Sequence, residues 1–559
     1  MICGFHGDRQ KNFHHIWLIY GVSLALIAGD RYLATVVRSM ATSGVEGFMV
    51  EIEASTIRGQ QQMISIIGLP DQAIKEAGER IQAAIESCGY DLPKEKVILS
   101  LAPGNRKKRG SHFDLGMIIA LLFQTDQIVA RNLGEYAFIG ELALDGRIRP
   151  CNGVLSMITE AKKCGIKTVI VPFENREEAA SVSGMQICPV KSLPETVRFL
   201  EGKLSLKNLQ EEGMNKAGHV ESVTDDNGNP PNVGSSFDFA EVRGQENLIE
   251  AIVLGAAGGH NVLMIGEPGC GKTMIAQRIP TILPGMTEQE SLEVTKIHSI
   301  AGLLDAGSGL IRERPFRAPH HNVSLNALIG GGSYAQPGEV SLAHNGVLFL
   351  DELAEFSKST LDALRQPLED KRVTISRVNG TNSYPANFMF VAAMNPCPCG
   401  YFPSKKCHCT DYEILHYRSK ISGPILERFD IQKSVAQINF FDLTEKKNHY
   451  TSAELRKRVE ETRSIQQERY RHDEDVNCNA QMSTSQIQKY CKLDHECTEI
   501  LKSASEKYGY SARVIHKLLR LARTAADLDA SDDIHREHIV QVLGCRDLDV
   551  STSQMYAIR

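Results

Sequence analysis

The stretch GEPGCGKT, residues 266–273, decides the fold class of this chain. It follows the short apolar run VLMI (262–265) and precedes a segment with helical periodicity. This is the G-x-x-x-x-G-K-[ST] pattern in the strand–loop–helix setting that the pattern requires. Its glycines let backbone N–H groups curl around phosphates at the N-terminus of a helix. The stretch therefore predicts an α/β domain that binds a nucleoside triphosphate.

The residues of this loop have different expected roles. Lys272 is expected to bring a point charge to the phosphates, and the hydroxyl of Thr273 to hold Mg²⁺. We therefore expect ATP and Mg²⁺ as cofactors. The complete binding loop consists of Gly266, Glu267, Pro268, Gly269, Cys270, Gly271, Lys272 and Thr273.

Two further apolar runs end in polar residues. GVLFL (346–350) ends in Asp351, expected to help hold Mg²⁺, and Glu352, expected to orient or deprotonate the attacking water. An Asp-Glu pair can also be a helix N-cap with a first-turn acid, but its place after a buried strand favours hydrolysis. FMFVAAM (388–394) ends in Asn395, whose amide can position the water or simply occupy a turn.

Four segments together resemble a known family: GEPGCGKT, GVLFLDELAEF, AAMNPCPCG and ISGPILERFD. They are similar to the magnesium-chelatase-like branch of AAA+ ATPases and, more narrowly, to the ComM/YifB family of bacterial competence-associated proteins. The resemblance runs from about residue 40 to the C-terminus. It implies an AAA+ P-loop core followed by a C-terminal helical lid, assembled as a homo-hexamer.

The same resemblance implies roles for three polar residues. Asn395 matches the sensor-1 residue, and Arg428 in LERFD matches the arginine finger that reaches the γ-phosphate bound by the neighbouring subunit. Arg513 matches sensor 2, on the lid that closes over the nucleotide. From the residues alone, either arginine can equally form a surface ion pair.

Two further segments near these motifs are candidates for contact with a substrate or with a neighbouring subunit. In DKRVTISRVNG (370–380), two short strands are expected to flank a turn at N-G, with Arg377 at the tip. The segment resembles the pre-sensor-1 hairpin of helicase rings, which implies DNA contact by Arg377, and a solvated hairpin is the alternative. The paired His320 and His321 in PFRAPHH (315–321) have no further metal ligand nearby, so we expect a structural or subunit-contact role.

Four cysteines cluster in CPCGYFPSKKCHC (397–409). A C-x-C…C-x-C array with glycine and proline turns can wrap one tetrahedral zinc ion, although C-x-x-C spacing is more typical. His408 can substitute for one ligand, and four reduced cysteines without a metal are the alternative. The density of the cluster favours structural zinc on Cys397, Cys399, Cys407 and Cys409.

The first half of the chain contains GELALDGRIRP (140–150), which resembles the proteolytic domain of Lon. A Ser–Lys dyad, with the lysine as base, is the chemistry of such a protease. Here His112 stands where the G-P-S-A-G segment of Lon has its serine, and GVLSM (153–157) contains no lysine. Ser111 and Ser156 are hydroxyls without a matched base. We therefore expect a ribosomal S5-type α+β domain that is proteolytically inactive.

Composition is that of an ordinary globular protein, with 42% hydrophobic and 23% charged residues among 559. The net charge of −6 argues against a surface coated with basic residues, yet it allows a basic channel. The basic run RKKR (106–109) is expected to be a solvated loop, or part of a DNA-binding rim. Fourteen cysteines, without a convincing export signal, favour the reducing cytoplasm.

The N-terminal stretch needs its own interpretation. The apolar run 16–28 is only about half as long as the ~20 residues of a membrane span, and Asp30 and Arg31 follow it directly. We take Met40 as the functional start, and we expect no membrane partner. The expected domains are residues 1–39 as a non-native or disordered extension, 40–201 as the Lon-like domain, 202–236 as a linker, 237–438 as the AAA+ core and 439–559 as the helical lid.

The resemblance implies a hexameric ATPase that moves along single-stranded or branched DNA and migrates branches during natural transformation. The alternative is a chelatase-type ATPase that remodels a protein or a metal-insertion partner, because its ATPase core would look the same. A chelatase motor normally lacks a fused Lon-like domain, which favours the DNA motor. An ATP-dependent protease is disfavoured because the expected lysine is missing.

Overall fold

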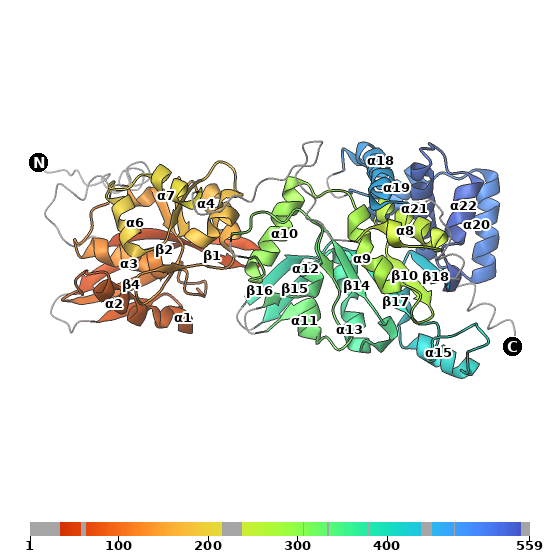
Figure 1. Cartoon of the computed structure of the whole chain (residues 1–559), viewed down its shortest axis with the longest axis horizontal. Helices are drawn as coiled ribbons and strands as arrows, with labels where there is room; N and C mark the ends of the chain where they lie inside the picture. The colour runs from red at the N-terminus through yellow and green to blue at the C-terminus, as the bar shows by residue number, and fades with distance from the viewer. Residues whose placement is uncertain are drawn as a thin grey trace, which may run out of the picture. The chain divides into compact units, whose positions relative to one another are not determined.

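The computed structural model shows two compact units (Figure 1). The first extends to Thr224 and includes Thr295–Leu310, and the second covers Asp225–Val294 and the chain from Ile311 onward. The residues that the structure describes are 34–57, 63–130, 132–214, 237–305, 307–332, 335–377, 380–437, 450–473 and 476–548.

The first unit is built on a mixed sheet of seven described strands in the order β3-β4-β2-β1-β5-β8-β9. Antiparallel pairing joins β1 to β2 and β2 to β4, and the other neighbours are parallel. The strands are β1 (Thr35–Ser43), β2 (Glu46–Ile57), β3 (Ile64–Ile67), β4 (Lys96–Ala102), β5 (Tyr136–Phe138), β8 (Thr168–Pro172) and β9 (Gln186–Val190); a separate ladder joins β6 (Glu141–Leu142) to β7 (Ile148–Arg149).

Helices complete this α+β unit. Helix α3 (Asp114–Gln124) has side chains that are almost all buried. Glu76 separates the helices α1 and α2. The other helices that the structure describes here are α1 (Gln72–Lys75), α2 (Ala77–Ser87), α4 (Val154–Lys163), α5 (Arg176–Ala180), α6 (Leu193–Leu200) and α7 (Leu206–Met214).

The assignment of residues 1–39 to a non-native or disordered extension is wrong for its last residues. Strand β1 begins at Thr35, and Val37 and Met40 are both fully buried. The hydroxyl of Ser39 donates to the carbonyl of Phe138 on β5, 2.7 Å away. Strand β1 lies in the middle of the sheet between β2 and β5, so a chain starting at Met40 would lose half of a central strand. Residues 1–33 lie outside the described residues.

The linker expected over 202–236 is also partly wrong, because its first third is helical. Leu209 on α7 is buried, and Gln210 donates through Nε2 to the carbonyl of Ile187 on β9, 3.1 Å away. A short amphipathic helix gains its stability from such packing rather than from its own sequence pattern. The polar composition of this stretch therefore predicted a linker where a helix forms. Residues 215–236 are not among those described, and the boundary between the two units falls after Thr224.

The second unit contains a wholly parallel sheet with the order β11-β14-β17-β10-β18. The three apolar runs of the sequence are its inner strands β10, β14 and β17, and every residue in them is buried. Because all strands run the same way, their carboxyl ends meet at one edge of the sheet. The strands are β10 (Val262–Gly266), β11 (Phe316–Arg317), β14 (Val347–Leu350), β17 (Met389–Met394) and β18 (Ile431–Val435).

Helices and hairpins surround this sheet (Figure 1). The described helices of the core are α8 (Glu246–Gly258), α9 (Lys272–Ile282), α11 (Leu325–Ile329), α12 (Glu339–Leu342), α13 (Lys358–Ala363), α14 (Arg365–Asp370), α15 (Asp411–Ser419) and α16 (Gly423–Leu426). Helix α10 (Glu288–Ile300) begins in this unit, and its residues from Thr295 onward belong to the first unit. The two-stranded ladders are β12 (Gly330–Gly331) with β13 (Gln336–Pro337) and β15 (Arg372–Arg377) with β16 (Gly380–Pro385).

The C-terminal part of this unit is helical and shares one hydrophobic core with the sheet. On α21, the buried residues Val514, Leu518, Leu521 and Ala525 form an apolar stripe at helical spacing. No described helix combines the length and the hydropathy that crossing a membrane requires. The helices are α18 (Ser452–Tyr470), α19 (Thr484–Tyr490), α20 (His495–Tyr508), α21 (Ala512–Leu528) and α22 (Arg536–Leu543).

Candidate nucleotide-binding site

The phosphate-binding loop connects the end of β10 to the first turn of α9. Gly269 and Gly271 adopt φ values of 79° and 89°, the left-handed region in which glycine is favoured, and this lets the loop turn back on itself. Lys272 is buried, and its Nζ donates to the carbonyls of Gly266 at 2.7 Å and Glu267 at 3.0 Å. The same Nζ donates to Oδ1 of Asn395 at 3.2 Å. The loop thus holds its lysine in place among acceptors that a bound phosphate can replace.

The expected magnesium ligands lie side by side. Oγ1 of Thr273 donates to Oδ2 of Asp351 over 2.5 Å, although 78 residues separate them. The backbone N–H of Glu352 donates to the other carboxylate oxygen of Asp351 at 2.9 Å. A hydroxyl and a carboxylate at the end of a parallel strand suit a small hard cation that keeps several waters. These residues fit Mg²⁺ bound together with a nucleotide.

Glu352 has a partner that the sequence patterns did not identify. Its Oε2 lies 3.2 Å from Nδ1 of His321. His321 comes shortly after β11, the strand that pairs with β14. Glu352 itself adopts φ 51°, an unusual value for a residue other than glycine, and its side chain is more than half exposed. Bidentate pairing of Arg317 with Glu339 fixes the end of β11 before His321. In the sequence, the only sign of this contact was a short apolar strand before the paired histidines. The sequence did not show that this strand lies beside β14.

Arg428 and Arg513 lie together but apart from this cluster. Arg428 pairs with Glu369, and its Nε is buried without a partner among the described residues. Arg513 is three-quarters exposed and lies 4.0 Å from Glu427, the residue directly before Arg428. Within the described chain, neither arginine contacts Lys272 or the other loop residues. The expectation that Arg513, as sensor 2, lies on a lid that closes over the nucleotide is supported by no contact within the described chain, and it stays a prediction.

A buried ion pair connects the two arginine-bearing segments. Nζ of Lys517, one turn after Arg513 on α21, lies 2.8 Å from Oδ1 of Asp430 in the LERFD segment. Burial alone would raise the pKa of Asp430, but the ammonium of Lys517 and the nearby imidazole of His260 hold it well below its usual range. Burial lowers the pKa of Lys517. Helix α21 is thereby anchored to the loop that carries Arg428.

The four clustered cysteines can hold a metal ion. Their Sγ atoms all lie within 4.8 Å of one another, and His408 is not part of the group. The sulfur–sulfur distances include 3.3 Å, 3.6 Å and 3.8 Å. A tetrahedral zinc site with Zn–S bonds of about 2.3 Å requires sulfurs about 3.8 Å apart. Backbone N–H groups of Tyr401 and His408 lower the pKa of Cys399 to about 6, which suits a thiolate ligand. The donor set fits zinc.

The expected hairpin is present, with β15 and β16 antiparallel and Arg377 opposite Gly380. Its base is fixed because Tyr384 is buried and donates to the carbonyl of Ala335 at 2.8 Å. Val378 and Asn379, where the turn was expected, lie outside the described residues, so DNA contact by Arg377 stays a prediction.

The region that resembles a protease holds no Ser–Lys pair among the described residues. Ser111 donates to Glu141. Where a Lon lysine is expected, the backbone N–H of Leu155 at the start of α4 donates to Oε1 of the buried Glu178 at 2.9 Å. Lys108 is not in a solvated loop or rim, because it is fully buried with its Nζ on backbone carbonyls, including that of Leu101 at 2.8 Å.

Comparison with known proteins agrees with this division of the chain. Sequence models of the family described as "Magnesium chelatase, subunit ChlI" match residues 238–443, those of "Subunit ChlI of Mg-chelatase" match 50–175, and those of its C-terminal part match 449–546.

Individual relatives extend over nearly the whole chain. YifB of Salmonella typhimurium is 37% identical over 515 residues, 92% of this chain and 97% of that protein. The competence protein ComM of Haemophilus influenzae is 36% identical over 516 residues, 91% and 97% of the two chains. A Lon protease of Xanthomonas oryzae pv. oryzae is 26% identical over 193 residues, which cover 32% of this chain and 22% of that protease.

Proposed function

This chain belongs to the ComM/YifB family of magnesium-chelatase-like AAA+ ATPases, and from that membership we propose that it is a hexameric, ATP-driven motor that moves branched DNA. The observation that carries the proposal is the separation of two sets of residues. Lys272, Thr273, Asp351 and Asn395 form one cluster, and Arg428 lies outside it with Arg513. A site divided in this way is complete only between two copies of the chain.

The geometry of the first cluster supports hydrolysis. Lys272 would exchange its present acceptors for phosphate oxygens, while Thr273 and Asp351 would hold Mg²⁺, which would supply charge neutralisation at the phosphates. Glu352, exposed and held at 3.2 Å by His321, orients the attacking water and accepts its proton. Asn395 positions that water or the γ-phosphate from the end of β17.

The arginines supply the rest of the site from the neighbouring subunit. Arg428 leaves Glu369 and approaches the γ-phosphate of the next copy, where it stabilises charge in the transition state. Because Lys517 anchors α21 to the same segment, Arg513 reaches the same phosphate from the same subunit. We therefore place sensor 2 in trans, on the same neighbour as the finger, and this arrangement requires a closed ring.

DNA is the proposed substrate on two grounds. The relative from Haemophilus influenzae is named a competence protein, and the β15–β16 hairpin presents Arg377 at its tip. A basic residue repeated around the pore of a ring would contact phosphates without reading sequence. Changes between subunit states during ATP hydrolysis would then pull single-stranded or branched DNA and migrate its branches, as integration of incoming DNA requires.

A chelatase-type remodelling ATPase is the second candidate, because the matching family models are described as magnesium chelatase. Such an enzyme would use the same ATP site on a protein or a metal-insertion partner. The Lon-like unit favours the DNA motor, and the partners of Ser111 and Leu155 speak against proteolysis. We also propose a structural zinc ion on the four cysteines and a cytoplasmic location, in which their thiols stay reduced.

Steady-state ATP hydrolysis tests this proposal. We expect the purified protein to hydrolyse ATP, and four-way or forked DNA to stimulate hydrolysis severalfold more than a mixture of proteins does. Lys272→Ala should abolish turnover at every DNA concentration. Hydrolysis that no DNA stimulates would favour the remodelling ATPase, and turnover by Lys272→Ala would refute the site itself.

A further inference from the structure

The loop that carries the four cysteines packs directly against the phosphate-binding loop. A Cβ atom on Gly400 would lie 2.8 Å from Cδ of Pro268 and 2.9 Å from its Cγ, so the backbone of Gly400 touches the proline ring. The φ of Gly400 is 86°, which also favours glycine. Pro268 is the third residue of the loop that binds the phosphates. One wall of the nucleotide site is therefore the cysteine loop.

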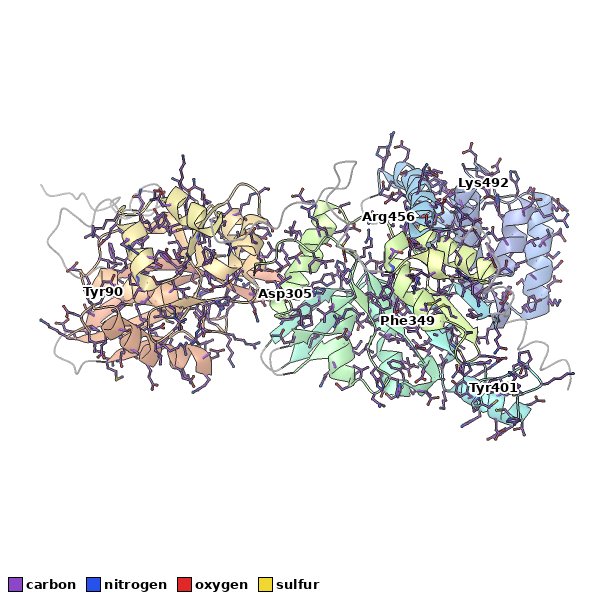
Figure 2. All side chains as sticks on the ribbon, in the orientation of Figure 1. Tyr90, Asp305, Phe349, Tyr401, Arg456 and Lys492 are labelled. Atoms are coloured by element: carbon purple, nitrogen blue, oxygen red, sulfur yellow. The ribbon has the colours of Figure 1, made fainter. Side chains whose placement is uncertain are left out.

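The same loop is joined to the site through Asn395. This residue accepts from Lys272 at 3.2 Å and stands two positions before Cys397, which is fully buried. The carbonyl of Pro396 accepts from Nε of Arg418 at 3.3 Å, and that guanidinium lies over the ring of Phe402. The proximal part of the loop is thus held both by the site and by α15. In Figure 2, Tyr401 marks the loop beside that helix.

The distal part of the loop has weaker support. Cys407 and Cys409 are only partly buried, and the backbone hydrogen bonds of 401–407 are local turns, such as Cys407 to Ser404 at 3.0 Å. The distal part nevertheless lies close to Cys397, because the four Sγ atoms are all within 4.8 Å of one another. The sulfur–sulfur distances of 3.3–3.8 Å are close to the edge of a ZnS₄ tetrahedron, so a metal ion bound between the four sulfurs would close the loop.

We propose that a zinc ion held by Cys397, Cys399, Cys407 and Cys409 braces the phosphate-binding loop, so that metal occupancy sets the affinity of the protein for ATP. With zinc bound, Gly400 presses on Pro268 and Asn395 stays in register with Lys272. Without zinc, the loop opens. Lys272 then loses its contact with Asn395, and Pro268 loses its contact with Gly400. The inference builds on the proposed ATP site but does not depend on DNA as the substrate.

The test measures zinc and nucleotide binding separately on the full-length protein. Zinc content is read by atomic absorption, and the Kd for ATP by competition with a fluorescent analogue, before and after chelation and after Zn²⁺ is returned. We expect one zinc ion per chain, a Kd at least about tenfold higher after chelation, and recovery on adding Zn²⁺. Cys409→Ser should behave like the chelated protein. Cys164→Ser, an exposed cysteine of the first unit, should match the wild type.

Gly400→Ala separates the brace from the metal site. Its methyl group meets Pro268, so zinc should stay at one per chain while ATP binding weakens about tenfold. A wild-type protein without zinc, or a Kd unchanged by chelation in a zinc-loaded protein, overturns the inference. Failure of the untreated, zinc-loaded protein to bind ATP would instead refute the proposed nucleotide site.

Discussion

Replacing Lys517 by methionine should uncouple ATP hydrolysis from ATP binding. Methionine keeps most of the apolar volume of lysine but removes the ammonium that pairs with Asp430. The LERFD segment then loses its anchor on α21, and Arg428 and Arg513 lose their common position. Among the described residues, no hydrogen bond or ion pair joins the phosphate-binding loop to either partner of this pair, so we expect nucleotide binding within one chain to be left intact.

The size of the effect follows from burial. The side chains of Lys517 and Asp430 are 16% and 10% exposed, and removing one partner of such a pair typically costs 3–5 kcal/mol. Asp430 keeps the backbone N–H of Asn261 at 3.0 Å and His260 at 3.6 Å, which places the loss near the lower end, at about 3 kcal/mol. The melting transition of the second unit should fall by roughly 4–5 °C.

Two assays on the same preparation check this prediction. Calorimetry gives the transition temperature, and nucleotide titration with steady-state turnover gives Kd and kcat. We expect a Kd within about twofold of the wild type and a kcat lower by roughly 10–100-fold, since a displaced arginine finger loses part of a contribution of 10³–10⁵. Lys502→Met removes an exposed lysine of α20 and should change neither quantity. If Lys517→Met weakens ATP binding but leaves kcat at the wild-type value, the division of the site between two subunits is wrong.

Three further predictions concern residues that act at a distance from the nucleotide. His321→Ala should lower kcat about tenfold without changing KM, because Glu352 loses the group that orients it; equal kcat values would make their contact incidental. Burial raises the pKa of Asp114 to about 6, so its proton stabilises the folded state fully below pH ~4 and this gain is lost as pH rises through 6. Relative to Asp114→Asn, the wild type should therefore gain up to about 3 kcal/mol between pH 7 and pH 4 in denaturant unfolding, and parallel pH profiles would contradict that pKa. Ser299→Ala should destabilise the first unit by about 1–2 kcal/mol in the same assay, because the buried Glu178 loses a donor, and an unchanged midpoint would show that the bond contributes nothing.

The sequence allowed prediction of those parts of the site whose residues lie in a short motif or directly after an apolar strand. Each inner strand of the parallel sheet is a continuous apolar run, and each polar residue of the first cluster follows such a run. Parallel strands then bring their carboxyl ends together, which is how Asn395 reaches Lys272 across 123 residues. The strand–loop–helix pattern thus implied most of the geometry around the phosphates.

The parts that could not be predicted depend on packing between distant segments. His321 reaches Glu352 only because β11 pairs with β14, and a strand of two residues leaves almost no periodicity to detect. Lys517 on a charged helix and Asp430 in a loop carry no local sign of being partners. The N-terminal boundary was wrongly predicted at Met40, although β1 begins at Thr35. The apolar run at 16–28 drew attention away from the start of this strand, and element boundaries are the least predictable feature of a sequence.

Strand displacement on a synthetic four-way DNA junction, with ATP and equal amounts of wild type and Glu352→Gln, tests the motor assignment most directly. The wild type is expected to convert the junction to two duplexes at a rate that follows ATP hydrolysis. Glu352→Gln should bind ATP and the junction but leave the junction intact. If the wild type hydrolyses ATP at its full rate while the junction stays unchanged, the protein is not a motor that moves branched DNA.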